Sequence, residues 1–228
     1  YKNDCRTDLP SRSIMFTGIV QSLGIVKNIR PKDGDLEITV KADRIDWNKI
    51  SIGESISING ICLTATKIHS DGFDADISSE TMSVTTLSNL KKNDQLNIEP
   101  SLTVGDKIGG HFVTGHIDCV AEIVSKESKA RAISLQIEVP NRIARYIAPK
   151  GSITVDGVSL TVNSVNGSNF NVYIIPHTAK ATIIGDYKIG DKVNIEIDMM
   201  ARYIERLLDK PNDGVITEKF LRDNGYDQ

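Results

Sequence analysis

The chain has 228 residues, of which 39% are hydrophobic and 25% are charged, and its formal net charge is −3. This length leaves room for two domains of about 100 residues each, and the composition excludes intrinsic disorder for most of the chain. The balance of 27 basic and 30 acidic residues provides no positive field for nucleic acid or an anionic membrane. No stretch approaches the roughly 20 apolar residues of a transmembrane helix.

The first fourteen residues, YKNDCRTDLPSRSI, are polar and show no periodicity before MFTGIV begins at Met15. We expect residues 1–14 to form an N-terminal extension outside the fold, and the alternative is the remnant of an organellar presequence. The three cysteines, Cys5, Cys62 and Cys119, form no CxxC pair, which disfavours a disulfide framework and a structural zinc site. A soluble protein of a reducing compartment is expected, in the cytoplasm or, if a presequence was removed, in an organellar stroma.

A repeat at a spacing of 97 residues organises the rest of the chain. Residues 55–65 read SISINGICLTA, and residues 152–162 read SITVDGVSLTV. The same spacing aligns Thr17-Gly18 with Thr114-Gly115, Glu80-Thr81 with His177-Thr178, and Asn97-Ile98-Glu99 with Asn194-Ile195-Glu196. We interpret this register as the duplication of a whole domain, with one copy over residues 15–101 and the other over residues 102–198.

Within each copy the apolar residues mostly alternate, and β-branched residues are frequent, as is typical of strands. The predicted strands include, in chain order, IVQSLGIV (19–26), LEITVKA (36–42), ESISING (54–60) and KVNIEID (192–198). Turn signals such as Asn59-Gly60 and Asn166-Gly167-Ser168 separate them at short intervals. Two short segments have helical spacing, WNKI at 47–50 and NRIARYIA at 141–148. The pattern predicts an all-β fold in each copy, either a barrel or a sandwich.

The segment MMARYIERLLDK, residues 199–210, predicts one amphipathic helix after the second copy. Its apolar residues fall three or four positions apart, and Pro211 follows as a stop signal. We expect this helix to pack against the same helix of other subunits, and the alternative is docking on the second domain of its own chain. The polar residues 211–228 are expected to form a loosely held tail.

The second position after the Asn-Gly or Asp-Gly turn holds Cys62 in the first copy and Ser159 in the second. Strand alternation places Ser159 and Thr161 on one face and Leu160 on the other. Two hydroxyl groups on one face could hydrogen-bond the edge of a heterocycle, although Thr161 also simply suits a strand. Cys119 is interpreted as a small residue of the core.

Two of the four histidines lie in GGHFVTGHID, residues 109–118. The density of glycines indicates a close approach of the backbone. His111 or His116 could transfer protons there, since an imidazole titrates near neutral pH, and the alternative is that neither has a functional role. No Ser-His-Asp spacing, P-loop, GxGxxG or HExxH motif is present, which removes the common hydrolase, nucleotide-binding and zincin interpretations.

Seven segments, taken in order, resemble the riboflavin synthase alpha-chain family from Met15 to about Leu208. They are MFTGIV, NGICLT, SSETMSVTTLSNLK, GGHFVTGHID, KGSITVDGVSLTV, IIPHTAKATIIG and NIEID. The resemblance implies two six-stranded antiparallel Greek-key barrels related by a pseudo-twofold axis, with a C-terminal helix over residues 199–210. It also implies a homotrimer held by these helices, and it leaves open an association with lumazine synthase.

The reaction that the resemblance implies is a dismutation, the last step of riboflavin biosynthesis, with no metal and no organic cofactor. Two molecules of 6,7-dimethyl-8-ribityllumazine exchange a four-carbon unit and give riboflavin and 5-amino-6-(D-ribitylamino)uracil. Two identical molecules must face each other in opposite orientations, and holding them in register makes their coupling effectively unimolecular. A duplicated domain supplies two similar pockets, and a site between subunits would let the N-terminal barrel of one face the C-terminal barrel of the next.

The matching motifs assign site residues by resemblance. One lumazine is expected against the C-terminal barrel, near Gly18, Ile19, Val20, Ser159, Leu160, Thr161, Ile174, Ile175, Pro176, His177, Thr178 and Ala179. The other is expected near Cys62, Leu63, Thr64, Asp76, Ile77, Ser78, Ser79, Glu80, Thr81, His116, Ile117, Asp118 and Lys150. The catalytic positions implied by the family fall on His116, Ser159, Thr161, Cys62 and Asp198, and the resemblance does not distinguish acid, base and nucleophile among them.

A non-catalytic relative of the same fold is the main alternative, similar to the lumazine and yellow fluorescent proteins of luminous bacteria, which bind lumazine or flavin as a chromophore. Those proteins resemble the synthase chiefly in the N-terminal pocket. Here the second copy keeps GHID, DGVSLTV, IPHT and Asp198, which favours the enzyme. A β-barrel nucleic-acid module is disfavoured by the acidic balance and the aromatic content of 5%.

Overall fold

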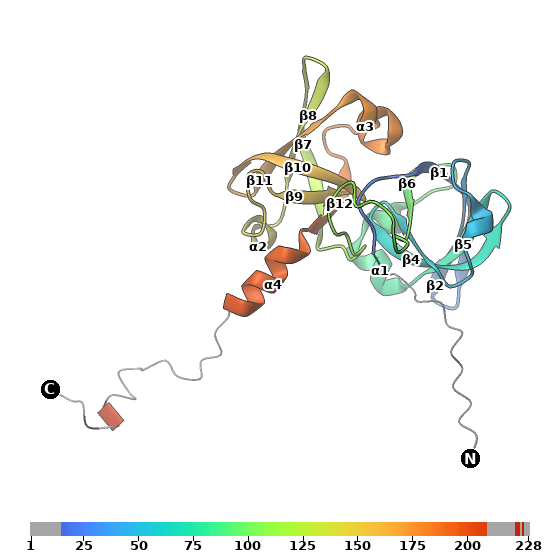
Figure 1. Ribbon diagram of the computed structural model, residues 1–228, viewed down its shortest axis with the longest axis horizontal. Coiled ribbons are helices and arrows are strands. Elements are labelled where there is room, and N and C mark those ends of the chain that lie inside the picture. Colours follow the sequence, from blue (N-terminus) through green and yellow to red (C-terminus); the bar gives the residue numbers. More distant parts are fainter. Residues whose placement is uncertain (1–14, 209–221, 224, 226–228) are drawn as a thin grey trace.

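The computed structural model describes residues 15–208, 222, 223 and 225. Its strands form two closed, six-stranded antiparallel barrels that lie side by side (Figure 1). The strand order is β1-β2-β5-β4-β3-β6 in the first barrel and β10-β11-β8-β7-β12-β9 in the second. The predicted all-β architecture of two tandem six-stranded barrels is confirmed.

The elements of the second barrel repeat those of the first along the chain. The first barrel contains β1 (Ser22–Lys32), β2 (Asp35–Ala42), β3 (Ser55–Ile58), β4 (Ile61–His69), β5 (Gly72–Ile77) and β6 (Gln95–Pro100). The second contains β7 (Cys119–Lys129), β8 (Ala132–Glu138), β9 (Ser152–Val155), β10 (Val158–Asn166), β11 (Asn169–Ile174) and β12 (Lys192–Ile197). The helices are α1 (Ser79–Val84), α2 (Asn141–Ala144), α3 (Pro176–Ala181) and α4 (Met199–Leu208).

Each barrel encloses its own apolar core, because strand alternation turns every second residue inward. Phe73, Ala75 and Ile77 of β5 point into the first barrel, and Phe170 and Val172 of β11 point into the second. Complete burial of a large apolar side chain contributes about 1.5–3 kcal/mol. The inward faces of the strands therefore supply most of the stability of each barrel.

The helices between the strands are shorter than the sequence pattern predicts. The WNKI segment forms one 3₁₀ turn, Trp47–Lys49, and the predicted helix at 141–148 is limited to α2. The helices α1 and α3 were not predicted, because six residues are too few to show a helical period. Their sequence signals are local: the Ser78 hydroxyl accepts the N–H of Thr81 at 3.1 Å, and Pro176 opens α3.

The Asn-Gly and Asp-Gly turns of the two copies meet where the barrels touch. Asn59, Gly60, Asp156 and Gly157 all have φ between +41° and +80°, as in the tight turns of hairpins. A Cβ on Gly60 would lie 2.7 Å from the backbone nitrogen of Gly157, and the converse distance is also 2.7 Å. The repeated glycine is therefore required by the contact between barrels as well as by the turn.

Two asparagines of the repeated NIE segments complete this junction around a pseudo-twofold axis. Asn97 Nδ2 donates to the carbonyl oxygen of Asp156 at 2.8 Å, and Asn194 Nδ2 donates to that of Asn59 at 3.1 Å. The Oδ1 atom of each asparagine accepts a backbone N–H from the opposite barrel at 2.9 Å. The two barrels are thus joined by a matched set of buried hydrogen bonds.

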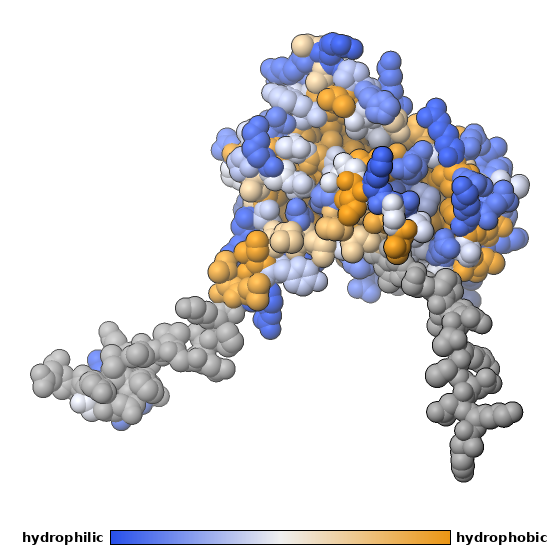
Figure 2. All heavy atoms as spheres, in the orientation of Figure 1, coloured by the Kyte–Doolittle hydropathy of each residue, from blue (hydrophilic) through white to orange (hydrophobic). Residues whose placement is uncertain are grey.

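The last helix, α4, extends from the second barrel and directs its apolar side chains to solvent (Figures 1 and 2). More than half of the surface of each of these residues is exposed: Met200, Tyr203, Ile204, Leu207 and Leu208. The opposite side of α4 is tied to the barrel, since the Tyr146 hydroxyl donates to the Glu205 carboxylate at 2.6 Å. The helix thus contacts the second barrel of its own chain, as in the alternative, but through its polar side, and the apolar stripe does not dock there.

The helix predicted over residues 199–210 ends at Leu208 within the described part of the chain. The predicted extension, residues 1–14, and residues 209–221 lie outside the described residues. None of the helices in the described part is long and apolar enough to span a membrane.

Candidate active site

Two short segments, residues 16–20 and 113–117, cross between the barrels and lie against the repeated motif strands; we call them the crossing segments. The carbonyl oxygen of Gly18 accepts the N–H of Ser159 at 2.8 Å, and that of Gly115 accepts the N–H of Cys62 at 2.9 Å. A Cβ on either glycine would lie 2.6 Å from the Cβ of its partner. Each candidate site therefore combines a strand of one copy with the crossing segment of the other.

A buried glutamate holds each crossing segment in place. Glu99 accepts the N–H and the hydroxyl of Thr17 at 2.7 and 2.8 Å, and the N–H of Gly18 at 3.1 Å. Glu196 accepts the same three bonds from the second crossing segment at 2.7, 2.7 and 2.9 Å. Burial raises the pKa of Glu99 to about 7 and also raises that of Glu196, although the hydrogen bonds act in the opposite direction. In the sequence the NIE repeat marked only the register, and this role of its glutamates was not predicted.

At the second barrel, the Ser159 hydroxyl of β10 is hydrogen-bonded to His111. The distance from His111 Nδ1 to Ser159 Oγ is 2.7 Å, and Nε2 lies 3.3 Å from Oγ1 of the buried Thr154 on β9. Burial lowers the pKa of His111. The sequence singled out His111 for its glycine-rich setting but did not connect it with Ser159, because 48 residues separate the two.

At the first barrel, Cys62 of β4 occupies the position that corresponds to Ser159. Burial raises the pKa of its thiol, a hydrogen bond with Ser55 opposes the rise, and the charge of Glu196 adds to it. The crossing segment beside Cys62 continues into His116, which is exposed, and Ile117, which packs against the core of the first barrel. The structure thus brings the predicted residues of β4 and of the GHID motif to one site.

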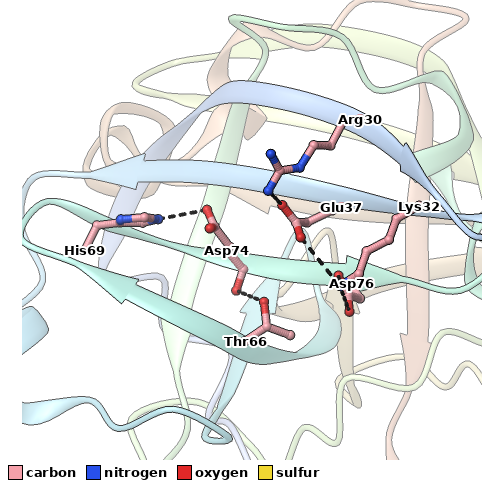
Figure 3. Close-up of polar contacts among 7 residues, drawn as sticks. All are labelled: Arg30, Lys32, Glu37, Thr66, His69, Asp74 and Asp76. Carbon is pink, nitrogen blue, oxygen red and sulfur yellow. Dashed lines mark hydrogen bonds and ion pairs between the residues drawn. The ribbon is translucent and has the colours of Figure 1, made fainter.

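The remaining residues of the two predicted sets lie where β5 and β11 lead into short helices. Asp76 and Ile77 end β5 before α1, and Ile174 ends β11 before α3. Lys32 Nζ donates to the two carboxylate oxygens of Asp76 at 2.9 and 2.8 Å (Figure 3). Any ligand group that reaches Asp76 must therefore share this carboxylate with Lys32.

Three of the predicted site residues have structural partners. Lys150 donates its N–H to Val162 of β10 at 2.7 Å, so it lies on the second barrel, whereas the residues grouped with it surround the first. The Asp118 carboxylate accepts the N–H of Ile197 at 2.8 Å. The Asp198 carboxylate accepts the N–H of Met200 at 3.0 Å, in the first turn of α4. Asp118 and Asp198 therefore hold the end of β12 and the start of α4.

The predicted alternation along β10 is confirmed, because Leu160 packs against the core while Thr161 is exposed. Cys119 lies in the core of the second barrel as predicted, and burial raises its pKa to about 12. Within the described residues, no group of three or more His, Cys, Asp or Glu side chains is placed to hold a metal ion.

Comparison with known proteins assigns both copies to one domain type. The family model described as "Lumazine binding domain" matches residues 17–101 and 114–198. Riboflavin synthase of Photobacterium phosphoreum is 46% identical over 216 residues, which cover 93% of this chain and 99% of that protein. Riboflavin synthase of Bacillus subtilis (strain 168) is 38% identical over 216 residues, covering 93% and 100% of the two chains.

Among solved structures, LumP complexed with riboflavin matches with a TM-score of 0.74 at 24% identity, over 80% of this chain and 98% of that one. LumP complexed with 6,7-dimethyl-8-(1'-D-ribityl) lumazine matches with a TM-score of 0.71 at 24% identity, over 79% and 98%. These two matches show the shared fold. Because the domain model covers both copies and the relatives cover nearly the whole chain, the protein belongs to the riboflavin synthase family of lumazine-binding proteins.

Proposed function

We propose that this chain is a transferase that converts two molecules of 6,7-dimethyl-8-ribityllumazine into riboflavin and 5-amino-6-(D-ribitylamino)uracil. The reaction consumes two copies of one substrate, and the chain carries two related sites. Each site joins a motif strand of one barrel to the crossing segment of the other. This duplicated construction, with Cys62 at one site and Ser159 at the other, is the observation that carries the proposal.

The second barrel supports a catalytic role over a purely binding one. Its site keeps a hydroxyl held by an imidazole, the Ser159–His111 pair, as expected where a proton must be moved. The relatives named riboflavin synthase span both barrels, which supports the same conclusion.

We place one lumazine at each site. The first lies against the second barrel and contacts Gly18–Val20, Ser159–Thr161 and Ile174–Ala179. The second lies against the first barrel and contacts Cys62–Thr64, Asp76–Thr81 and His116–Asp118. Two reactants held in a fixed relative orientation react as if their effective concentration were very high, and this is the main contribution expected from the protein.

The productive site is proposed to form between subunits of a homotrimer. The apolar side of α4 is exposed in one chain, and its burial against other copies of α4 would stabilise such an assembly. Lys150 lies on the second barrel, and a contact between it and the residues around Cys62 would fit an arrangement in which the second barrel of one subunit faces the first barrel of the next. In this scheme the two lumazine-binding domains are residues 15–101 and 102–198. The free thiols of Cys62 and Cys119 favour a location in the reducing cytoplasm.

Incubation of the purified protein with 6,7-dimethyl-8-ribityllumazine tests the proposed activity. We expect one riboflavin, identified by chromatography and fluorescence, for every two lumazine molecules consumed. Ser159→Ala is the matched control, and it should still bind lumazine while its turnover falls. Stoichiometric tight binding without riboflavin formation would reject the enzyme and favour the alternative, a chromophore-binding protein of this fold.

A further inference from the structure

One position at the junction between the barrels is filled in the second copy and open in the first. In the second copy the hydroxyl of Tyr187 donates to Oδ2 of Asp156, and Tyr187 is only 8% exposed. The residues 97 positions earlier are Leu90 and Asn59. A leucine has neither the ring nor the hydroxyl of a tyrosine. The first copy therefore lacks the group that fills this space in the second.

The backbones of the two copies match at this position. Leu90 directly follows the 3₁₀ turn Thr86–Asn89, and its φ and ψ are −64° and 137°. Tyr187 directly follows the 3₁₀ turn Ile183–Asp186, with φ −57° and ψ 147°. Each residue also donates its N–H to the carbonyl oxygen three residues earlier, at 3.2 and 3.4 Å. The two side chains therefore leave equivalent backbones in the same direction, and beside Leu90 the structure has a cleft of about 310 Å³.

Asn59 presents a hydrogen-bond donor to this cleft. Its Oδ1 accepts the N–H of Asn97 at 2.7 Å, as Oδ1 of Asp156 accepts that of Asn194 at 2.8 Å. The Nδ2 atom then corresponds to the Asp156 oxygen that Tyr187 contacts, and it has no partner among the described residues. Asn59 is 8% exposed, and within the described part of the chain every fully buried side-chain N or O atom has a partner. The Nδ2 atom therefore reaches solvent, through the cleft that Asn59 lines.

The lining of the cleft selects the chemistry of an occupant. The amide nitrogen of Asn59 can only donate, so a ligand must supply an acceptor atom. Leu90 provides an apolar wall, and a ring packed against it would remove apolar surface from water. Asp94 also lines the cleft, and its carboxylate, which accepts the N–H of Lys91 at 2.8 Å, repels an anion. These features favour a neutral ring that carries an oxygen atom.

We propose that the cleft beside Leu90 binds a small neutral phenol, whose ring takes the place of the Tyr187 ring and whose oxygen accepts a hydrogen bond from Asn59. The occupant would lie against the junction, since Asn194 Nδ2 donates to the carbonyl oxygen of Asn59 and to the hydroxyl of Thr86, both of which line the cleft. A ligand held there binds only the folded chain and stabilises it. None of the residues that line the cleft belongs to either predicted set of lumazine contacts.

Two measurements on the wild-type chain test this site. Calorimetric titration with p-cresol should give a dissociation constant on the order of 1 mM, and toluene, which lacks the oxygen, should bind about tenfold more weakly. In crystals soaked with 4-bromophenol, the anomalous signal of bromine should locate the ring beside Leu90. Equal affinities for p-cresol and toluene, or bromine only at the candidate lumazine sites or elsewhere, would overturn the proposal.

Leu90→Tyr tests whether the cleft is the counterpart of the space that Tyr187 fills. The new ring should occupy the cleft, so the binding of p-cresol should be lost. Val104→Tyr is the matched control, because it adds the same side chain at a position that is 95% exposed, and it should bind p-cresol as the wild type does. Unchanged binding in a folded Leu90→Tyr variant would contradict the assignment.

The bromine position and the comparison of p-cresol with toluene need no variant, so they decide the assignment even if Leu90→Tyr does not fold. Failure of the proposed function is distinguished in the same way. A wild-type protein that forms no riboflavin but binds p-cresol beside Leu90 would reject the transferase and retain this site.

Discussion

Asp156 makes the junction between the barrels chemically unequal. Its carboxylate accepts the N–H and Nδ2 of Asn194, both at 2.8 Å, and the hydroxyl of Tyr187 donates to its second oxygen. Burial raises the pKa of Asp156 to about 7, against the lowering effect of these hydrogen bonds. The first copy has Asn59 and Leu90 at the corresponding positions, 97 residues earlier. The junction is therefore symmetric in shape but carries an ionisable group on one side only.

Replacement of Asp156 by Asn, the residue of the first copy, should change how stability depends on pH. The pKa of this carboxyl is raised from the ordinary value of 3.8, so the folded chain keeps a proton that the unfolded chain releases. Its stabilising effect is full below that ordinary value and is lost as the pH rises through about 7. Urea denaturation should show that the unfolding free energy of the wild type decreases between pH 5 and pH 8. In Asp156→Asn this decrease should be smaller than in the wild type, by on the order of 2 kcal/mol.

Asp33→Asn is the control for this measurement, because Asp33 also precedes a glycine in a turn with positive φ but is exposed. It should leave the pH dependence unchanged. Part of the wild-type dependence should persist in Asp156→Asn, since Glu99 also has a pKa of about 7. Equal pH dependence in the wild type and Asp156→Asn would show that the carboxyl is not protonated in the folded chain.

Among the elements, the turns and strands were more predictable than the contacts between them. Asn59-Gly60 was identified as a tight turn because the residue types alone indicate positive φ. That this turn touches Gly157 of the other copy could not be predicted, since no local pattern encodes a contact between residues so far apart. The only sequence signal for this contact was the repeat, because a contact across a pseudo-twofold axis requires a glycine at the same position in both copies.

A comparison of Gly60→Ala with Gly34→Ala separates two reasons why a glycine is needed, the positive φ of a turn and the close contact between the barrels. Both positions have positive φ, +80° and +93°, so both substitutions carry the same kind of backbone strain. A Cβ on Gly34 meets nothing within 4 Å, whereas a Cβ on Gly60 would lie 2.7 Å from the Gly157 nitrogen. In urea denaturation, Gly60→Ala should therefore cost about 1–3 kcal/mol more than Gly34→Ala. Equal costs would mean that the barrels are not in contact at this turn.

The exposed side of α4 predicts the effect of polar substitutions on assembly. Ile204→Glu combined with Leu207→Glu places two charges on a side where Leu207 is 83% exposed in the single chain. These changes should leave the barrels folded and reduce the sedimentation coefficient from that of a trimer to that of smaller species, as should truncation before Met199. Arg206→Gln, on the same helix outside the apolar stripe, is the control. A trimer that persists in the double variant and in the truncated chain would show that α4 does not hold the subunits together.

At the scale of the whole molecule, the sequence predicted the two repeated β domains. It did not predict that each domain contributes its crossing segment to the site of the other. Alternation and the spacing of 97 residues were sufficient for two β domains, and the family resemblance assigned Cys62, Ser159 and His116 to the candidate site, an assignment that stays a prediction. The exchange of crossing segments was not predicted, because Gly18 precedes the first barrel in the chain and yet lies against Ser159 of the second. The contact of His111 with Ser159 depends on that exchange. The sequence therefore indicated the residue types of the site but not which copy supplies each of them.

The central claim is that the two sites of one chain are halves of a reaction centre shared between subunits, and subunit mixing tests it most directly. Ser159→Ala impairs the site of the second barrel, and His116→Ala impairs that of the first, so each variant alone should have little activity. In trimers refolded from an equal mixture of the two, about a quarter of the interfaces should combine two intact halves, and riboflavin formation should recover to about a quarter of the wild-type rate. A mixture no more active than the separate variants would show that the reaction centre lies within one chain and would contradict the account.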